Sequence, residues 1–249
     1  MSSSLQPLMP SPAAHSARAF VDGLALRAGE GAARPRVVAA MIASADGRAS
    51  VDGRSVALGH PADRALLREL RAAADAVLVG TATLAAEGYA SLLDDDQRTR
   101  RRERGLEETP LVATVSRRLE LPVGIGLFAE PSSRVVVYTE SGAEPPATAA
   151  RLAVHRFDPG ALDLGAVLAR LGSEHGARLV LCEGGPTLLR RLVAEGALDD
   201  LFLTVSPLLV AGDADTLLSG PALEPAARLS LRDIHRSGEH LFVHYAVSR

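Results

Sequence analysis

Short apolar runs alternate with amphipathic stretches along most of this chain. Runs of apolar and β-branched residues, bounded by glycine or polar residues, predict buried strands. Such runs occupy residues 36–43, 75–80, 109–116, 134–140, 150–157, 177–183 and 198–210. Apolar residues at helical spacing predict helices at residues 60–74, 81–93, 164–176 and 187–196. Strands that alternate with helices are typical of an α/β fold with a mainly parallel central sheet.

The two ends and one internal segment depart from this alternation. Residues 1–17 are rich in Ser, Pro and Ala and predict a poorly ordered tail. Residues 94–108 carry mixed charge without an apolar face and predict a solvated loop or a frayed helix. Residues 228–249 predict two strands joined by a turn, which form an antiparallel C-terminal edge. We therefore expect a partly disordered N-terminal extension over 1–34 and one domain over 35–249.

Composition excludes several classes of function. The chain has 249 residues and a net charge of -3, so it has no strong attraction for nucleic acid or a membrane surface. Cys182 is its only cysteine, which excludes an internal disulfide framework and a multi-cysteine zinc site. The histidines share no metal-ligand spacing, so we expect no metal site. We expect a cytoplasmic protein, because no secretory signal or membrane-spanning run is visible.

The basic residues exclude two further kinds of functional site. All 27 are arginine, and the absence of lysine excludes both Schiff-base chemistry and a GxxxxGK[ST] phosphate loop. A GxGxxG fingerprint is also missing, which argues against a standard Rossmann site.

Polar and glycine-rich residues follow the predicted strands. Ligands of parallel α/β sheets bind beyond the carboxyl ends of the strands, so these positions are candidate binding residues. Glycines let phosphates approach the main chain, the first turns of helices offer free N–H groups, and arginines offer charge. This rim suits a dinucleotide. Each segment also has a plain structural interpretation, such as a tight turn at 183–185, a turn former at Asp46, or solvated charge at 116–118.

Four segments occur in an order that resembles a known family. They are "RPRVVAAMIASADGRAS", "LRAAADAVLVGTATL", "LVLCEGGPTLLRRL" and "LDDLFLTVSPLLVAG". They look like the reductase domain of riboflavin biosynthesis, a family similar to dihydrofolate reductase in fold. The resemblance covers roughly residues 35–249. The H-x-E…P-C-x-x-C signature of the zinc deaminase found in bifunctional members is absent, so a stand-alone reductase is expected.

The resemblance implies reduction of a phosphorylated ribosylamino-pyrimidine by NADPH. Asp46 and Glu183 are its candidate catalytic residues, and Glu183 should face the pyrimidine. Ser44 and Arg71 should bind the substrate, with Arg71 at its phosphate. The cofactor-binding residues implied are Gly80, Thr81, Thr83, Ser116, Arg117, Gly184, Gly185, Thr187 and Leu188, with Ser116 and Arg117 at the 2′-phosphate. The family also implies a homodimer.

Two departures from the family pattern fall on the substrate side. Ala40 stands where members commonly carry lysine, and "EGYASLLDDDQR" replaces D-N-P-x-L-x-x-R, with Glu87 and Tyr89 in the Asp and Pro positions. Two alternatives therefore stay open: a dihydrofolate reductase-like activity on a pterin, and a non-catalytic nucleotide-binding protein that retains the fold.

Overall fold

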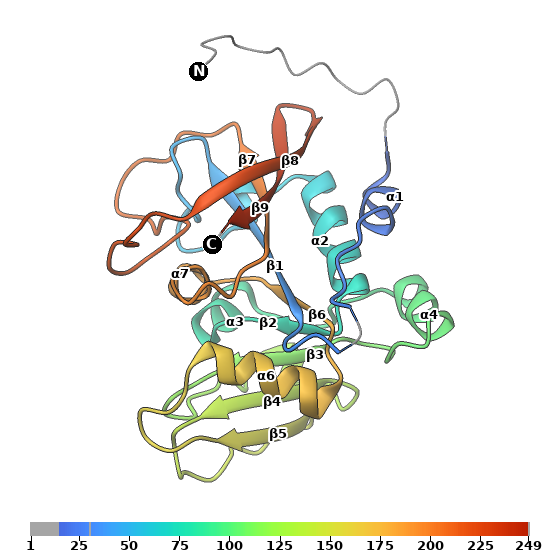
Figure 1. Cartoon of the computed structure of the whole chain (residues 1–249), viewed down its shortest axis with the longest axis vertical. Coiled ribbons are helices and arrows are strands. Elements are labelled where there is room, and N and C mark those ends of the chain that lie inside the picture. The colour runs from blue at the N-terminus through green and yellow to red at the C-terminus, as the bar shows by residue number, and fades with distance from the viewer. Residues whose placement is uncertain (1–14, 30, 249) are drawn as a thin grey trace.

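A computed structural model describes residues 15–29 and 31–248, in which nine strands form one sheet (Figure 1). The strands are β1 (Arg36–Ser44), β2 (Ala76–Leu78), β3 (Leu111–Val115), β4 (Arg134–Thr139), β5 (Arg151–Arg156), β6 (Leu179–Cys182), β7 (Asp200–Ser206), β8 (Arg228–Ser237) and β9 (His240–Ser248). Their order across the sheet is β5-β4-β3-β2-β6-β1-β7-β9-β8. The pairs from β5 to β7 are parallel, whereas β9 pairs antiparallel with both β7 and β8. The predicted α/β class with an antiparallel edge is confirmed.

Helices cover both faces of the sheet because the buried strands alternate their side chains between two apolar clusters. They are α1 (Ala17–Asp22), α2 (Pro61–Ala73), α3 (Thr81–Glu87), α4 (Asp95–Glu103), α5 (Gly126–Ala129), α6 (Leu164–His175) and α7 (Pro186–Ala194), with a 3-10 turn, η1 (Val56–Leu58). Side chains of α1, α2 and α5 pack in one cluster. Those of α6 and α7 pack in the other. Among the described residues, no helix is long and apolar enough to cross a membrane.

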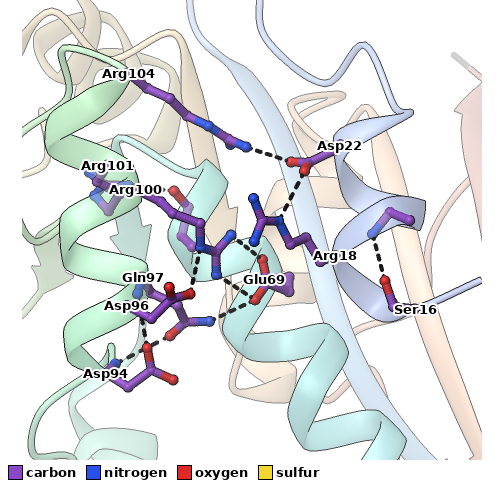
Figure 2. Close-up of polar contacts among 12 residues, drawn as sticks. Ser16, Arg18, Asp22, Glu69, Asp94, Asp96, Gln97, Arg100, Arg101 and Arg104 are labelled. Atoms are coloured by element: carbon purple, nitrogen blue, oxygen red, sulfur yellow. Dashed lines mark hydrogen bonds and ion pairs between the residues drawn. The ribbon is translucent and has the colours of Figure 1, made fainter.

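The prediction for residues 94–108 is wrong, because a capped helix, α4, forms there. The Asp94 carboxylate accepts a hydrogen bond from the Gln97 amide, and the Gln97 side chain accepts one from the Asp94 amide. Figure 2 shows how this helix packs through polar groups, since Arg100 and Gln97 both reach Glu69 on α2. Arg101 is only 1% exposed. The helix is thus buried by charge pairing, which hydrophobic periodicity does not reveal.

Three other predicted boundaries differ from those in the structure. The helix expected over 81–93 ends at Glu87, because Gly88 adopts a left-handed conformation with φ of 63°. The strand expected to run to residue 210 ends at Ser206, before Pro207. Of the predicted tail, residues 1–14 lie outside the described part of the chain, and α1 begins at Ala17 with Ser16 as its cap.

Candidate active site

A cavity of about 560 Å³ opens at the carboxyl ends of the central strands. Its walls come from the middle of β1, one face of α2, the segments after β2 and β6, and two side chains of β7. Seven of the predicted site residues line it: Gly80, Thr81, Thr83, Glu183, Gly185, Thr187 and Leu188. Parallel strands whose ends meet at one edge explain why segments so distant in the chain lie together.

The turns after β2 and β6 lie against each other through bare main chain. The Gly80 amide donates a hydrogen bond of 2.8 Å to the Gly184 carbonyl. A Cβ added at Gly185 would lie 2.8 Å from Thr83 Oγ1, so a side chain at this position would crowd that contact. Gly184 has φ of 80°, which favours glycine, although it does not itself line the cavity. Helix α7 begins at Pro186 without a side-chain cap, leaving the amides of its first turn unpaired within the helix.

The far wall holds a buried ion pair that includes the predicted carboxylate. Glu183 accepts hydrogen bonds from Arg71 Nε at 2.7 Å and from Arg71 Nη2 at 2.6 Å. The Tyr89 hydroxyl donates to the second oxygen of the same carboxylate. Glu183 is 8% exposed, and both Tyr89 and Glu183 line the cavity. Sequence reasoning noted Tyr89 as a departure from the family pattern and missed this hydroxyl.

Burial and the neighbouring Glu183 shift the pKa values of Arg71 and Tyr89. Burial lowers the pKa of Arg71, but the adjacent Glu183 carboxylate outweighs burial and raises it above its ordinary value. Burial, and then the Glu183 charge, raise the pKa of Tyr89 well above its usual value. The tyrosine therefore keeps its proton at neutral pH and is the donor in the contact with Glu183.

Arg71 is held differently from what the resemblance implied. It does not line the cavity, and two nitrogens of its guanidinium are taken up by Glu183. The geometry gives it the task of orienting a carboxylate and does not support the predicted contact with the substrate phosphate.

A second carboxyl, which sequence reasoning missed, enters the cavity from the first turn of α2. Asp63 accepts a hydrogen bond of 2.7 Å from the Thr204 hydroxyl, and both residues line the cavity. Burial raises the pKa of Asp63, and the bond from Thr204 only partly offsets it. Its signal in the sequence was slight, because an aspartate in the first turn of a helix is an ordinary dipole-stabilising residue.

Asp46 and Ser44 hold a loop together. The Ser44 hydroxyl donates to Asp46 Oδ1 at 2.5 Å, and the amides of Val210 and Ala211 donate to the same carboxylate. These bonds, that of Ser44 first, lower the pKa of Asp46 to about 2. Neither residue lines the cavity, and a catalytic Asp46 and a substrate-binding Ser44 stay predictions. Together they fasten the end of β1 to the loop after β7.

Ser116 and Arg117 follow β3 just beyond Val115, which lines the cavity. The Ser116 hydroxyl donates to the Glu120 carbonyl at 3.0 Å, and Arg117 is exposed. Neither residue lines the cavity: Ser116 is buried next to it, and Arg117 is exposed at the surface.

Comparison with known proteins identifies relatives over most of the chain. The model of the RibD C-terminal domain family matches residues 35–243. The 2,5-diamino-6-ribosylamino-4(3H)-pyrimidinone 5′-phosphate reductase of Archaeoglobus fulgidus is 27% identical over 213 residues, which cover 83% of this chain and 95% of the relative. The enzyme of the same name from Methanothermobacter thermautotrophicus is 29% identical over 223 residues, or 86% and 99% of the two chains. The crystal structure of a pyrimidine reductase-like protein from Corynebacterium diphtheriae superposes with a TM-score of 0.73 at 24% identity, covering 86% and 92% of the two chains.

Proposed function

The chain belongs to the RibD C-terminal domain family, and from that premise we propose that it reduces a phosphorylated ribosylamino-pyrimidine of riboflavin biosynthesis with NADPH. When bound, the nicotinamide would supply the hydride that reduces C1′ of the sugar. The residues of the chain bind and orient the two ligands, exclude water, and donate one proton.

The facing turns after β2 and β6 fit a dinucleotide. Gly80 and Gly185 present bare main chain to the cavity, a Cβ at Gly185 would crowd Thr83, and Thr81, Thr83 and Thr187 offer hydroxyls beside it. The uncapped first turn of the nine-residue helix α7 suits a diphosphate, because its amides can donate to anionic oxygens. Arg191, on the next turn of α7, is the one arginine among the described residues lining the cavity.

Arg117 supports the choice of NADPH over NADH. Its exposed guanidinium lies at the surface two residues beyond Val115, at the edge of the proposed cofactor cleft. A guanidinium recognises a phosphate through charge and parallel hydrogen bonds. The Ser116 hydroxyl donates to a carbonyl, which leaves its oxygen only as an acceptor, so Arg117 carries the proposed 2′-phosphate contact.

Glu183 is proposed to bind the pyrimidine ring. Arg71 and Tyr89 fix the plane of its carboxylate, and the side chain borders the cavity next to Gly185. A carboxylate held in this way can accept hydrogen bonds from the N–H and amino groups of an aminopyrimidine. Preorientation lowers the cost of ordering the group when substrate binds.

Asp63 is proposed as the proton donor. Its raised pKa favours the protonated carboxyl more than at an exposed aspartate, and it faces the cavity with Thr204 as its fixed partner. Opening the ribosylamine ring requires a proton on the leaving sugar oxygen, and a positioned carboxylic acid contributes about 10²–10⁴-fold to such a step.

The substrate phosphate needs positive charge that the cavity wall does not offer near Glu183. Among the described residues that line the cavity, Arg191 is the one arginine, whereas four residues carry carboxylates: Asp63, Glu87, Glu183 and Asp215. Arg54 lies between Gly53 and Ser55, which both line the cavity, and its side chain is exposed at that rim. We propose that the substrate phosphate binds at Arg54. This residue would take the role that the resemblance gave to Arg71, which pairs with Glu183 instead.

The observation that carries this proposal is a fixed carboxylate beside a bare glycine turn inside one cavity. The proposed activity is tested by assaying the purified chain with NADPH and either the diaminopyrimidinone or the aminouracil form of the ribosylamino phosphate. Consumption of NADPH equal to the ribitylamino product formed supports the proposal. Turnover of dihydrofolate alone would favour the pterin alternative, and no NADPH binding would favour the non-catalytic one.

We also propose a cytoplasmic homodimer. Leu229 and Leu231 are 45% and 49% exposed and lie on one face of β8, the edge strand of the sheet. An unpaired edge strand with exposed leucines is a ready surface for a second copy of the chain.

A further inference from the structure

Away from the cavity, the fold brings a histidine of a strand together with an adjacent glutamate and histidine at the end of a helix. His155 belongs to the edge strand β5, and Glu174 and His175 are the last two residues of α6. One potential ligand atom from each residue lies within 4.8 Å of those of the other two. The cluster escapes a search for short metal-binding motifs because the helix supplies two of its members and the strand the third.

We propose that His155, Glu174 and His175 form a binding site for a divalent transition-metal ion, with zinc as the ion of best fit. Imidazole nitrogens and carboxylate oxygens are both zinc ligands, and two histidines with one glutamate are a set that zinc accepts. Three protein ligands leave the fourth tetrahedral position for water.

The distances suit such an ion. His155 Nδ1 lies 3.1 Å from Glu174 Oε2. Neighbouring ligand atoms of a tetrahedral zinc ion are about 3.3 Å apart, given zinc-to-ligand bonds near 2 Å. The other oxygen, Glu174 Oε1, lies 3.8 Å from Arg170 Nε, which leaves Oε2 for the ion. A zinc ion would lie between Nδ1 and Oε2 and bind both atoms.

An unpaired nitrogen beside this contact points to the same conclusion. His175 Nε2 is buried and has no hydrogen-bond partner within the described part of the chain. The ring of His175 meets that of His155 edge-on, with centroids 5.6 Å apart, and Tyr138 stacks on the other ring at 5.4 Å. A buried polar atom without a partner costs free energy, and coordination of a metal supplies the missing partner.

A zinc ion bound at this site would stabilise the edge of the sheet. β5 pairs only with β4 among the described strands, and the ion would tie it to the end of α6. A cation is also favoured at the C-terminus of a helix. None of the three ligand residues lines the cavity, so the proposal is independent of the proposed reductase function.

The test is zinc binding to the untagged full chain after treatment with a chelator. Titration calorimetry should give one zinc ion per chain, and the melting temperature should rise by roughly 5–10 °C at a hundredfold excess over Kd. Cobalt added in place of zinc should produce the visible absorption of a four-coordinate ion. His155→Gln and His175→Gln should each abolish all three responses.

His60→Gln is the matched control. It removes a histidine from the neighbouring ring pair His60–His240, which belongs to no such cluster among the described residues, and should leave zinc binding unchanged. Glu174→Gln keeps the size of the side chain but removes its charge, and should weaken zinc binding at least tenfold. Melting in chelator verifies that each variant folds. Absence of binding at about 1 mM zinc, or equal affinity in the variant lacking both histidines, would overturn the proposal.

Discussion

At the scale of single residues, the site depends on how Glu183 is held. A buried carboxylate is stable only when it is paired and hydrogen-bonded. Arg71 supplies the charge and two hydrogen bonds, and Tyr89 supplies a third. Arg71, which the resemblance assigned to the substrate phosphate, therefore pairs with the Glu183 carboxylate. Tyr89 stands at the position where the family pattern led us to expect proline.

Tyr89→Phe tests this arrangement. Loss of one hydrogen bond to a charged group should lower the free energy of unfolding by about 1–2 kcal/mol. Because the carboxylate then turns more freely, KM for the pyrimidine should rise about tenfold while the Kd of NADPH stays within a factor of about two. Steady-state kinetics and cofactor titration measure both. Tyr138→Phe is the control, since that hydroxyl is buried without a partner among the described residues and its removal should change neither constant.

Asp63→Asn should separate stability from activity. The folded-state pKa of Asp63 is raised above its ordinary value of 3.8, so its favourable contribution is present below that value and is lost as pH rises through the folded pKa. The amide removes the cost of a buried charge. The variant should therefore melt higher than wild type at pH 8, with the difference shrinking toward pH 4, while kcat falls about 100-fold. A variant that melts lower at pH 8, or keeps full kcat, would contradict the assigned role.

The predicted site residues that the structure brings together share a feature. Those that line the cavity, such as Gly80 and Gly185, follow strands whose order could be inferred from apolar runs. Asp46 resembles them in sequence, but its carboxylate turns toward the amides of residues 210 and 211, and no local pattern reveals that contact. Asp63 and Tyr89 were missed because their partners, Thr204 and Glu183, lie more than ninety residues away.

At the scale of elements, the decisive feature is the approach of two turns. The amide of Gly80 bonds the carbonyl of Gly184, so the turns after β2 and β6 form one continuous wall. Apolar runs predicted both strands and therefore this wall. Helix α4 was missed for the opposite reason, because its buried face consists of Gln97, Arg100 and Arg101. Partner charges such as Glu69 become visible only in three dimensions.

Gly185→Ala tests the wall. Its φ of -75° permits alanine, so the effect comes from the Cβ that would lie 2.8 Å from Thr83 Oγ1. The Kd of NADPH should increase at least tenfold, as measured by fluorescence titration, because the turn must move away from the cofactor. Thr83→Ala in the same chain should restore part of the affinity by removing the obstructing oxygen. Gly142→Ala is the control, since an added Cβ there meets nothing within 4 Å.

At the scale of the whole molecule, the sheet has two different edges. β5 contacts α6 through His155, whereas β8 carries exposed leucines. Leu231→Arg should convert the proposed dimer to a monomer, as measured by light scattering during size exclusion. Arg232→Ala is the control, because it changes an adjacent exposed residue without adding charge to the leucine face. A wild-type chain that elutes as a monomer at micromolar concentration would contradict the dimer.

The whole molecule also explains why the cofactor and the substrate should meet where they do. The parallel half of the sheet brings glycine turns to one edge, and α2 and β7 bring Asp63 and Thr204 to the same cavity. Each set combines a residue from the first half of the chain with one from the second half, so neither half alone forms the site.

The most direct test is a crystal structure of the chain with NADP⁺ and the ribosylamino-pyrimidine phosphate. We predict the diphosphate at the first turn of α7, the nicotinamide beside Gly80 and Gly185, and the pyrimidine hydrogen-bonded to Glu183. Cofactor density outside this cavity, or a pyrimidine that makes no contact with Glu183, would contradict the account.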